Sequence, residues 1–457
     1  MSLTHRFPDG FQWGTATSAY QIEGAVDADG RGASIWDTFC RAPGRVLGGD
    51  TGDVACDHHH RLEGDLDLMS RLGIQTYRFS VAWPRVIPKG RGPVSEAGLD
   101  FYRRLVDGLL ERGIAPLVTL FHWDLPQALD DEGGWLSRDT VDAYVDYAAL
   151  VAEALGDRVP SFTTFNEPWC SAFLGYASGD HAPGHTDAGE AFRVAHHLNL
   201  AHARAVSALR CVLPSSAAIS LTLNVHQVYP ASHDPADRRA TEHVDLISNR
   251  IFLDPALGHG YPDALVDTTR TITDWSFVEA GDIGALHAPI DGLGINYYTS
   301  ALIADPASPA GRQAHLAWPG TTKAVSLAPD GELTGIGWRI TPGALTDLLR
   351  RIAADAPTMP LTIHENGAAY DVAVIDGLVD DTVRIRYLDA HLRALHDAIT
   401  AGVDVRGYML WSFLDNFEWA RGYSQRFGIV HVDFDTLART PKASADWYAG
   451  VIAANGL

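Results

Sequence analysis

Two glutamates, each at the end of a β-prone segment, are the residues of this sequence best suited to chemistry. Residues 361–365 form an apolar and β-branched run that ends in Glu365, and the Asn-Gly pair that follows is typical of a turn. Residues 161–167 form a second such run, and Pro168 ends that strand directly after Glu167. Two carboxyl groups in one cavity could act as a proton donor and as a nucleophile or base in glycosidic cleavage.

The elements that must position these glutamates alternate along the chain. We expect strands at residues 11–21, 74–80, 114–122, 161–167, 217–224, 292–298, 361–365 and 405–411. We expect helices at residues 62–72, 101–111, 139–155, 190–212, 239–251, 344–354, 381–401 and 445–454. Eight strand–helix units favour right-handed crossovers and predict an α/β fold, a single (β/α)8 TIM barrel with long loops at the carboxyl face of the strands. That face would hold the site.

The segments between these elements show no linker that would separate a second domain. Residues 226–288 are predicted to be an insertion with at least one helix, and residues 305–337, rich in Pro, Gly and Ala, to be a surface excursion. We therefore expect residues 1–457 to form one catalytic barrel domain.

The composition limits the partners. The chain has 457 residues, 46% of them hydrophobic, and a formal charge of −22, so nucleic acid and anionic membranes are not expected to bind it. Residues 1–8 lack the apolar part of a signal peptide, and no stretch reaches the ~20 apolar residues of a membrane span. The four cysteines lack metal-ligand or C-x-x-C spacing. These features predict a cytoplasmic protein with free thiols.

Polar and aromatic side chains gather at the ends of the predicted strands and suit a sugar. Aromatic rings cover the apolar face of a pyranose, whereas amides, imidazole and carboxylates bind its hydroxyl groups. A fixed cation could keep one glutamate ionised. The residues at the strand ends are Gln21, Arg78, His122, Asn166, Asn224, Asn296, Tyr298 and Trp411.

No metal or cofactor is expected. The three consecutive histidines at residues 58–60 could not all face one ion from a helix, and no carboxylate is suitably spaced beside them. Structural roles are therefore favoured for these histidines.

Several longer motifs make the sequence similar to glycoside hydrolase family 1, the β-glucosidase family, over nearly its whole length. Residues 11–24 resemble the opening signature of the family, residues 164–168 its acid/base motif and residues 363–367 its nucleophile motif. Residues 411–419 resemble its sugar-recognition motif, and residues 252–255 a further family segment. The resemblance implies a retaining β-glucosidase that also accepts fucosides or galactosides, without a cofactor, and acts on β-glycosides or short oligosaccharides such as cellobiose.

The resemblance also implies roles by position. Glu167 would be the general acid/base and Glu365 the nucleophile, with carboxyl groups about 5–5.5 Å apart. Asn296 and Tyr298 would position the nucleophile, and Arg78 is expected to lie nearer Glu365 than Glu167. The remaining residues would bind the sugar, line the entrance for the aglycone or support the site: Gln21, His122, Asn166, Glu418 and Trp419 on the glycone, Trp411 under the ring, Trp169 and Trp338 at the entrance, Phe427 in the substrate-binding set and Trp123 in support.

Three positions inside the motifs add detail. A carboxylate at Glu418 would repel a phosphate, which favours an unphosphorylated sugar. An intact Glu167 favours O-glycosides, since thioglucosidases of the family have Gln there. His364 stands where the family usually has Thr, and alternation along the strand predicts that it points away from the cavity, between barrel and helices.

Two alternatives stay open alongside hydrolysis. The same residues would serve a transglycosylase, and a non-catalytic sugar-binding barrel protein would be expected to have lost Glu167 or Glu365. The preference among glucose, galactose and fucose, the aglycone and the oligomeric state are not determined by the sequence.

Overall fold

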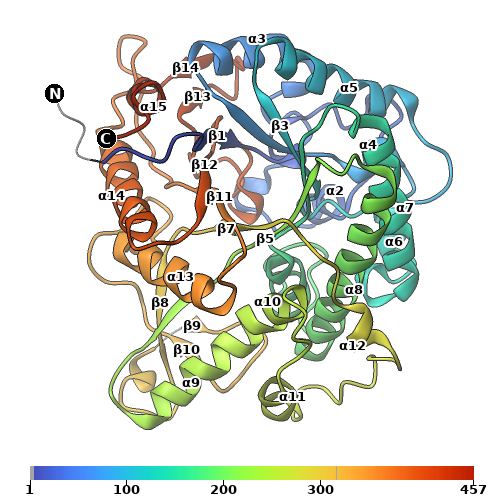
Figure 1. The fold of residues 1–457 in the computed structure, drawn as a ribbon, viewed down its shortest axis with the longest axis vertical. Helices are drawn as coiled ribbons and strands as arrows, with labels where there is room; N and C mark the ends of the chain where they lie inside the picture. Colours follow the sequence, from blue (N-terminus) through green and yellow to red (C-terminus); the bar gives the residue numbers. More distant parts are fainter. Residues whose placement is uncertain (1–4, 315) are drawn as a thin grey trace.

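Eight parallel strands close into a barrel within residues 5–314 and 316–457, the part of the chain that the computed structural model describes (Figure 1). The strands are neighbours in the order β1-β12-β11-β7-β5-β4-β3-β2. The predicted (β/α)8 barrel is confirmed. Its strands are β1 Gln12–Ala16, β2 Thr76–Ser80, β3 Ala115–Phe121, β4 Ser161–Asn166, β5 Ala218–Leu223, β7 Gly292–Asn296, β11 Leu361–Asn366 and β12 Val405–Trp411.

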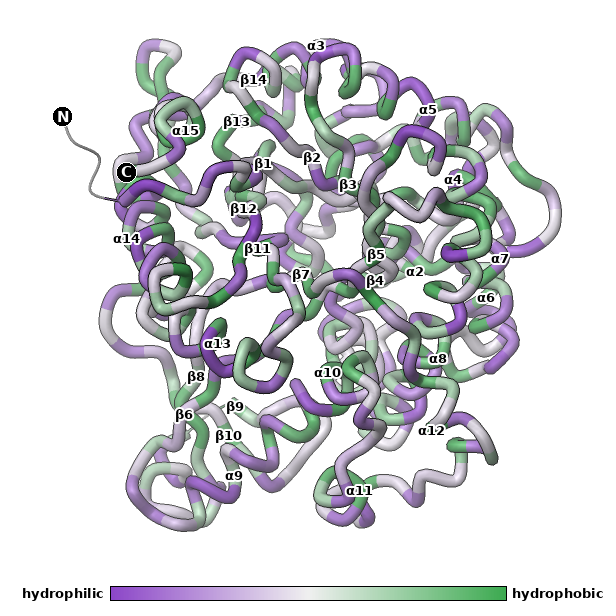
Figure 2. Tube along the Cα trace, viewed as in Figure 1, coloured by the Kyte–Doolittle hydropathy of each residue, from purple (hydrophilic) through white to green (hydrophobic). Residues whose placement is uncertain are grey.

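Helices surround this barrel because each has one apolar face. In α5 (Glu96–Glu111), for example, Leu99, Leu105 and Leu109 are buried, and the Ser95 side chain accepts a hydrogen bond from the first turn. The other long helices are α3 His58–Arg71, α7 Arg138–Leu155, α8 Ala188–Val212, α9 Pro235–Asp245, α13 Pro342–Asp355, α14 Thr382–Thr400 and α15 Ala443–Ala454. Figure 2 shows α9, far from the barrel axis, as largely hydrophilic.

Shorter helical segments lie mainly in the loops. The α-helical ones are α1 Ala19–Ile22, α2 Ile35–Arg41, α4 Trp83–Val86, α6 Gln127–Asp130, α10 Ile251–Ala256, α11 Asp263–Thr269 and α12 Asp282–Ala285. Residues Cys170–Ser178 and Leu246–Arg250 form π-helical turns. The 3-10 segments are Leu47–Gly49, Gly134–Leu136, Gly311–Gln313 and Trp419–Arg421.

Two parts of the fold differ from the sequence-based expectation. The first strand ends at Ala16, so Gln21 lies on α1 and not on the strand. A four-stranded sheet was also not expected: the insertion contributes β6 Gln227–Pro230, the surface excursion contributes β10 Val325–Ser326 and β9 Leu316–Ala317, and β8 Ser300–Ala304 comes from the residues just before that excursion. These strands are two to five residues long and carry weak periodicity, which explains why local patterns missed them.

Smaller features complete the architecture. Strands β13 (Val430–Val432) and β14 (Arg439–Pro441) form an antiparallel pair beyond the last barrel strand. Among the described residues, no helix combines the length and the apolar character needed to cross a membrane.

Candidate active site

Glu365 lies on β11 between a cation and a phenol. Nη1 of Arg78, on β2, donates to Oε1 of Glu365 at 2.6 Å, and the Tyr298 hydroxyl donates to Oε2 at 2.6 Å. The Arg78 side chain has no exposed surface, so its charge is shielded little by solvent. Both contacts agree with the positions expected for Arg78 and Tyr298, and each is a short hydrogen bond to a carboxylate oxygen.

Glu167 directly follows β4 and has different partners. Its φ of 47° lies in the left-handed region, and its N–H donates to the carbonyl of Thr222 at 3.0 Å. Nδ2 of Asn296 donates to Oε1 at 2.7 Å, and the thiol of Cys170 donates to Oε2 at 3.2 Å. Asn296 was expected to position the nucleophile; it is paired with Glu365 in the strand register, and its side chain donates to Glu167.

Asn166 connects the surroundings of the two glutamates. Its Oδ1 accepts from Nη2 of Arg78 at 2.7 Å and from Nδ2 of Asn296 at 3.0 Å. Its Nδ2 donates to Nε2 of His122 at 3.0 Å. Because Arg78 can only donate, these contacts fix the orientation of the Asn166 amide and then that of Asn296.

The surroundings separate the protonation states of the two carboxyl groups. Burial, followed by the negative charge of Glu365, raises the pKa of Glu167 to about 8. The hydrogen bonds from Asn296 and Cys170 and the charge of Arg78 act in the opposite direction but are weaker. At neutral pH Glu167 therefore holds a proton, while Glu365 lies against the cation. This difference is what an acid and a nucleophile require.

Gln21 and Glu418 form a second polar group beside the carboxyl pair. Nε2 of Gln21 donates to Oδ1 of Asn416 at 3.0 Å and to Oε2 of Glu418 at 3.3 Å, while its Oε1 accepts from Ser18 at 2.6 Å. Burial, followed by the charges of Glu365 and Glu167, raises the pKa of Glu418 to about 8. Glu418 is thus largely uncharged at neutral pH, which weakens the argument that its charge repels a phosphate there.

An aromatic wall adjoins these polar groups. The His122 ring is stacked between Trp411, at 5.9 Å and 21°, and Trp419, at 6.0 Å and 19°. Trp123 packs on Trp419 at 4.6 Å and donates from Nε1 to the carbonyl of Asn166 at 2.9 Å. The structure thus brings the predicted residues His122, Trp123, Trp411 and Trp419 together beside Asn166.

The two tryptophans expected at the entrance have different neighbours. Trp338 packs against Tyr298 at 5.2 Å and Phe427 at 6.0 Å, close to the partners of Glu365. Trp169 follows Glu167 by two residues and packs against His226 at 4.5 Å. Each tryptophan is therefore next to one of the two carboxyl regions.

His364 does not lie where strand alternation predicts. The register of β11 against β7 shifts between Ile363 and Glu365, so successive side chains do not alternate there. Nδ1 of His364 is 2.7 Å from Oγ1 of Thr222 on β5, and a Cβ atom on Gly294 of β7 would lie 2.2 Å from Nδ1. The ring also lines a cavity of about 570 Å³ at the amino ends of the strands. It therefore lies inside the barrel, beneath the glutamates.

The protonation of His364 follows from this location. Burial, followed by the charge of Arg78, lowers the pKa of His364 well below its ordinary value. The ring is neutral at neutral pH, so it does not add a second charge beside Glu365.

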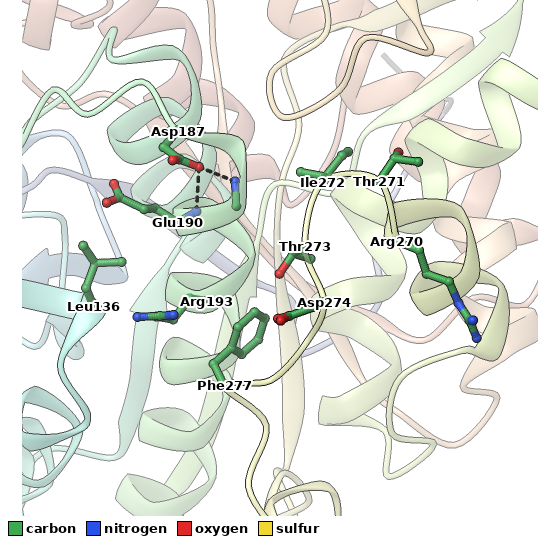
Figure 3. Close-up of a pocket in the computed structure, with 11 residues that line it drawn as sticks. Leu136, Asp187, Glu190, Arg193, Arg270, Thr271, Ile272, Thr273, Asp274 and Phe277 are labelled. Carbon is green, nitrogen blue, oxygen red and sulfur yellow. Dashed lines mark hydrogen bonds between the residues drawn. The ribbon is translucent and has the colours of Figure 1, made fainter.

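Two other regions of the molecule do not show the features of this site. His58, His59 and His60 each lie against an aspartate, and no group of three metal-binding side chains occurs in residues 5–314 and 316–457. A hollow of about 500 Å³ lies between the start of α8 and residues 270–277, where Arg193, Asp274 and Phe277 approach one another (Figure 3). It contains none of the residues predicted to bind or cleave a substrate.

Sequence reasoning named Asn224 only as a polar residue at a strand end and did not single out Cys170 for the site. Cys170 bonds to Glu167, and Nδ2 of Asn224 donates to its Sγ at 3.3 Å. The spacing of three residues between Glu167 and Cys170, directly before a helical segment, is a signal that could have indicated their contact.

Comparison with known proteins places this geometry in context. The model of Glycosyl hydrolase family 1 matches residues 3–457. A bifunctional β-D-glucosidase/β-D-fucosidase of Bifidobacterium breve is 50% identical, with 99% of each chain covered. A thermostable β-glucosidase B of Thermobispora bispora is 48% identical, with 99% of this chain and 91% of the relative covered.

Solved structures extend the comparison to the fold. A family 1 β-glucosidase of Thermotoga maritima has a TM-score of 0.93 and 42% identity, with both chains covered fully. A psychrophilic β-glucosidase of Micrococcus antarcticus has a TM-score of 0.95 and 44% identity, again over the whole of both chains.

Proposed function

Because this chain belongs to glycosyl hydrolase family 1, we propose that it is a retaining β-glucosidase that releases the β-D-glucosyl residue from the non-reducing end of β-glycosides. The observation that carries the proposal is the unequal environment of two carboxyl groups in one site. Arg78 and Tyr298 bond to Glu365, whereas burial raises the pKa of Glu167 to about 8. The names of the relatives in this family support the same activity.

In the first step, a carboxylate oxygen of Glu365 forms a bond to the anomeric carbon while the bond to the leaving oxygen breaks. Glu167 gives its proton to that oxygen, so the aglycone leaves as a neutral alcohol or sugar. In the second step, Glu167 takes a proton from water, whose oxygen displaces Glu365. Two inversions at one carbon retain its configuration.

The glycone would contact the polar group formed by Gln21 and Glu418 and the aromatic wall. A hydrogen bond joins the side chains of Gln21 and Glu418, so they would present a fixed set of polar atoms to the sugar hydroxyl groups. The substrates would be O-glycosides, including short oligosaccharides such as cellobiose. The fucosidase activity in the name of the Bifidobacterium breve relative supports testing β-fucosides, and β-galactosides belong in the same series.

The setting of this activity is also part of the proposal. We propose that residues 1–457 act as one catalytic barrel domain, without a cofactor. A cytoplasmic location is supported by the four cysteines, all of which are free thiols. Transglycosylation is not favoured, because the named relatives are glucosidases. Sugar binding without catalysis is not favoured, because both carboxyl groups are in place.

The experiment compares the wild type with Glu365→Gly on an aryl β-glucoside. We expect kcat to fall by at least about 10³-fold, because no nucleophile remains. Azide should restore turnover by attacking from the vacant side, and NMR should identify the product as the α-glycosyl azide. Undiminished hydrolysis by Glu365→Gly would falsify the proposal.

A further inference from the structure

Cys170 lies between an amide and the carboxyl group of Glu167. Its Sγ is 3.2 Å from Oε2 of Glu167, and Nδ2 of Asn224 donates to the same sulfur at 3.3 Å. The residue is 6% exposed and begins the π-helical segment Cys170–Ser178. π-Helical turns interrupt regular helices and occur frequently at functional sites. Asn224 directly follows β5, so these two hydrogen bonds connect the end of β5 to Glu167 through Cys170.

The thiol keeps its proton in this location. Burial, followed by the charge of Glu167, raises the pKa of the Cys170 thiol well above its ordinary value. A neutral thiol has one hydrogen to donate and lone pairs that accept weakly. The amide of Asn224 occupies one acceptor direction, and the S–H can still rotate, so that it points at Oε2 when Glu167 is ionised.

The two oxygens of Glu167 face partners of different kinds. Oε1 faces Nδ2 of Asn296, which can only donate. Oε2 faces the sulfur, which can donate to a carboxylate and accept from a carboxylic acid. A proton on Oε1 would point against another N–H, so the proton of the acid form belongs on Oε2.

We propose that Cys170, held by Asn224, is a positioning residue that fixes Oε2 of Glu167 as the oxygen that carries the catalytic proton. The inference rests on the proposed function, because it refines the role of Glu167 in that reaction. In the first step the proton passes from Oε2 to the leaving oxygen as the glycosidic bond breaks. Cys170 does not itself exchange a proton with the substrate.

Several other groups act on the same proton and must be kept constant in any test. Burial and the charge of Glu365 raise the pKa of Glu167, while the bonds from Asn296 and Cys170 and the charge of Arg78 lower it. The ionisable groups of Tyr298 and Glu418 also face this region. Variants at Cys170 leave all of these groups in place.

The test compares Cys170→Ala, which removes the hydrogen bond, with Cys170→Ser, which keeps a rotating donor and acceptor. Each variant is measured on a glucoside with a poor leaving group, such as cellobiose, and on a 2,4-dinitrophenyl glucoside, whose leaving group needs no proton. For Cys170→Ala we expect kcat/KM on cellobiose to fall about 10-fold or more, with little change on the dinitrophenyl glucoside. Cys170→Ser should stay within about three-fold of the wild type on both substrates.

The pH profile provides the second readout. The S–H bond favours the ionised form of Glu167, so its removal should move the alkaline limb of kcat/KM to higher pH by about 0.5 unit. Asn224→Ala should shift the limb in the same direction by a smaller amount. Cys211→Ala is the matched control, because Cys211 is exposed on α8 and its thiol donates to the carbonyl of Ser207 in the same helix.

The outcomes separate the inference from the proposed function. An equal loss on both substrates, or an alkaline limb that does not move in Cys170→Ala, would overturn the role of Cys170. Full turnover of the dinitrophenyl glucoside shows that the variant is folded and that Glu365 still acts. Failure of the wild type to hydrolyse either glucoside would contradict the proposed function itself.

Discussion

The guanidinium of Arg78 donates to Oε1 of Glu365 at 2.6 Å from a side chain without exposed surface. Glu167 receives its two side-chain hydrogen bonds from Asn296 and Cys170, neither of which is charged. The permanently charged Arg78 is therefore hydrogen-bonded to the carboxyl group of Glu365 and not to that of Glu167. That asymmetry gives the two glutamates different roles at the same pH.

The first prediction concerns the pH dependence of the reaction. Glu167 must be protonated to act as an acid, and its pKa is raised to about 8 by burial and by the charge of Glu365. We expect kcat/KM to fall as pH rises through about 8. The check is kcat/KM between pH 4 and 10 on an aryl glucoside with a poor leaving group.

A control for this prediction uses Glu167→Gln and a 2,4-dinitrophenyl glucoside. Formation of the glycosyl-enzyme from this substrate needs no acid, so the alkaline limb near pH 8 should disappear in the variant. A limb that persists would assign it to another group, such as Glu418.

The second prediction concerns the cation itself. Replacing Arg78 by Met removes a buried charge and three hydrogen bonds, to Glu365, to Asn166 and to the carbonyl of His364. We expect kcat/KM to fall by about 10²-fold or more, because Glu365 loses the cation that contacts it. Stability should fall by about 3–5 kcal/mol, since the partner charge is left buried.

Arg78→Lys is the matched control. It keeps the charge but cannot donate to Glu365 and Asn166 in the same fork, so it should lose less activity than Arg78→Met. Equal losses in the two variants would argue against the charge as the cause. Kinetics and thermal unfolding of all three proteins provide the measurement.

The third prediction tests the location of His364 inside the barrel. A Cβ atom added at Gly294 would lie 2.2 Å from Nδ1 of His364, so Gly294→Ala should destabilise the protein by about 1–3 kcal/mol. In a His364→Ala background the space is open, and the same change should be milder by at least about 1 kcal/mol. Thermal unfolding of the single and double variants gives the coupling.

Gly450→Ala provides the control for this cycle. A Cβ atom there would meet nothing within 4 Å, and the residue is inside α15, so the change should be neutral or slightly stabilising. If Gly294→Ala were equally harmful with and without His364, the ring would not be its obstacle.

The fourth prediction concerns Glu418, whose pKa is raised to about 8 by burial and by the neighbouring carboxylates. Below that pH it is neutral, and above it the carboxylate repels anions. A carboxylate at Glu418 is expected to repel a phosphate on the bound sugar, so discrimination against 6-phosphoglucosides should rise about 10-fold between pH 7 and pH 9. The measurement is the ratio of kcat/KM for a glucoside and its 6-phosphate.

Taking a ratio removes the shared dependence on Glu167, because both substrates need the same acid. In Glu418→Gln the ratio should not change with pH, since no charge can form at that position. A ratio that changes equally in the variant would exclude Glu418 as the source of the discrimination.

The sequence by itself determined the barrel and the two glutamates. Residues 361–365 and 161–167 carry strand periodicity and turn signals, which depend on neighbours within a few residues of Glu365 and Glu167. Alternation of strands and helices predicts a parallel barrel, because crossovers between parallel strands follow one handedness. Local chemistry and simple topology therefore suffice for these features.

Only the tertiary structure decided how the side chains pair. The side chain of Asn296 donates a hydrogen bond to Glu167 and not to Glu365. Cys170, on the helical segment that follows β4, donates a second hydrogen bond to Glu167. His364 lies inside the barrel because the register of β11 against β7 shifts next to Glu365. Register and side-chain direction depend on partners far along the chain, 142 residues apart in the case of Thr222 and His364, and strand alternation along one segment cannot contain that information.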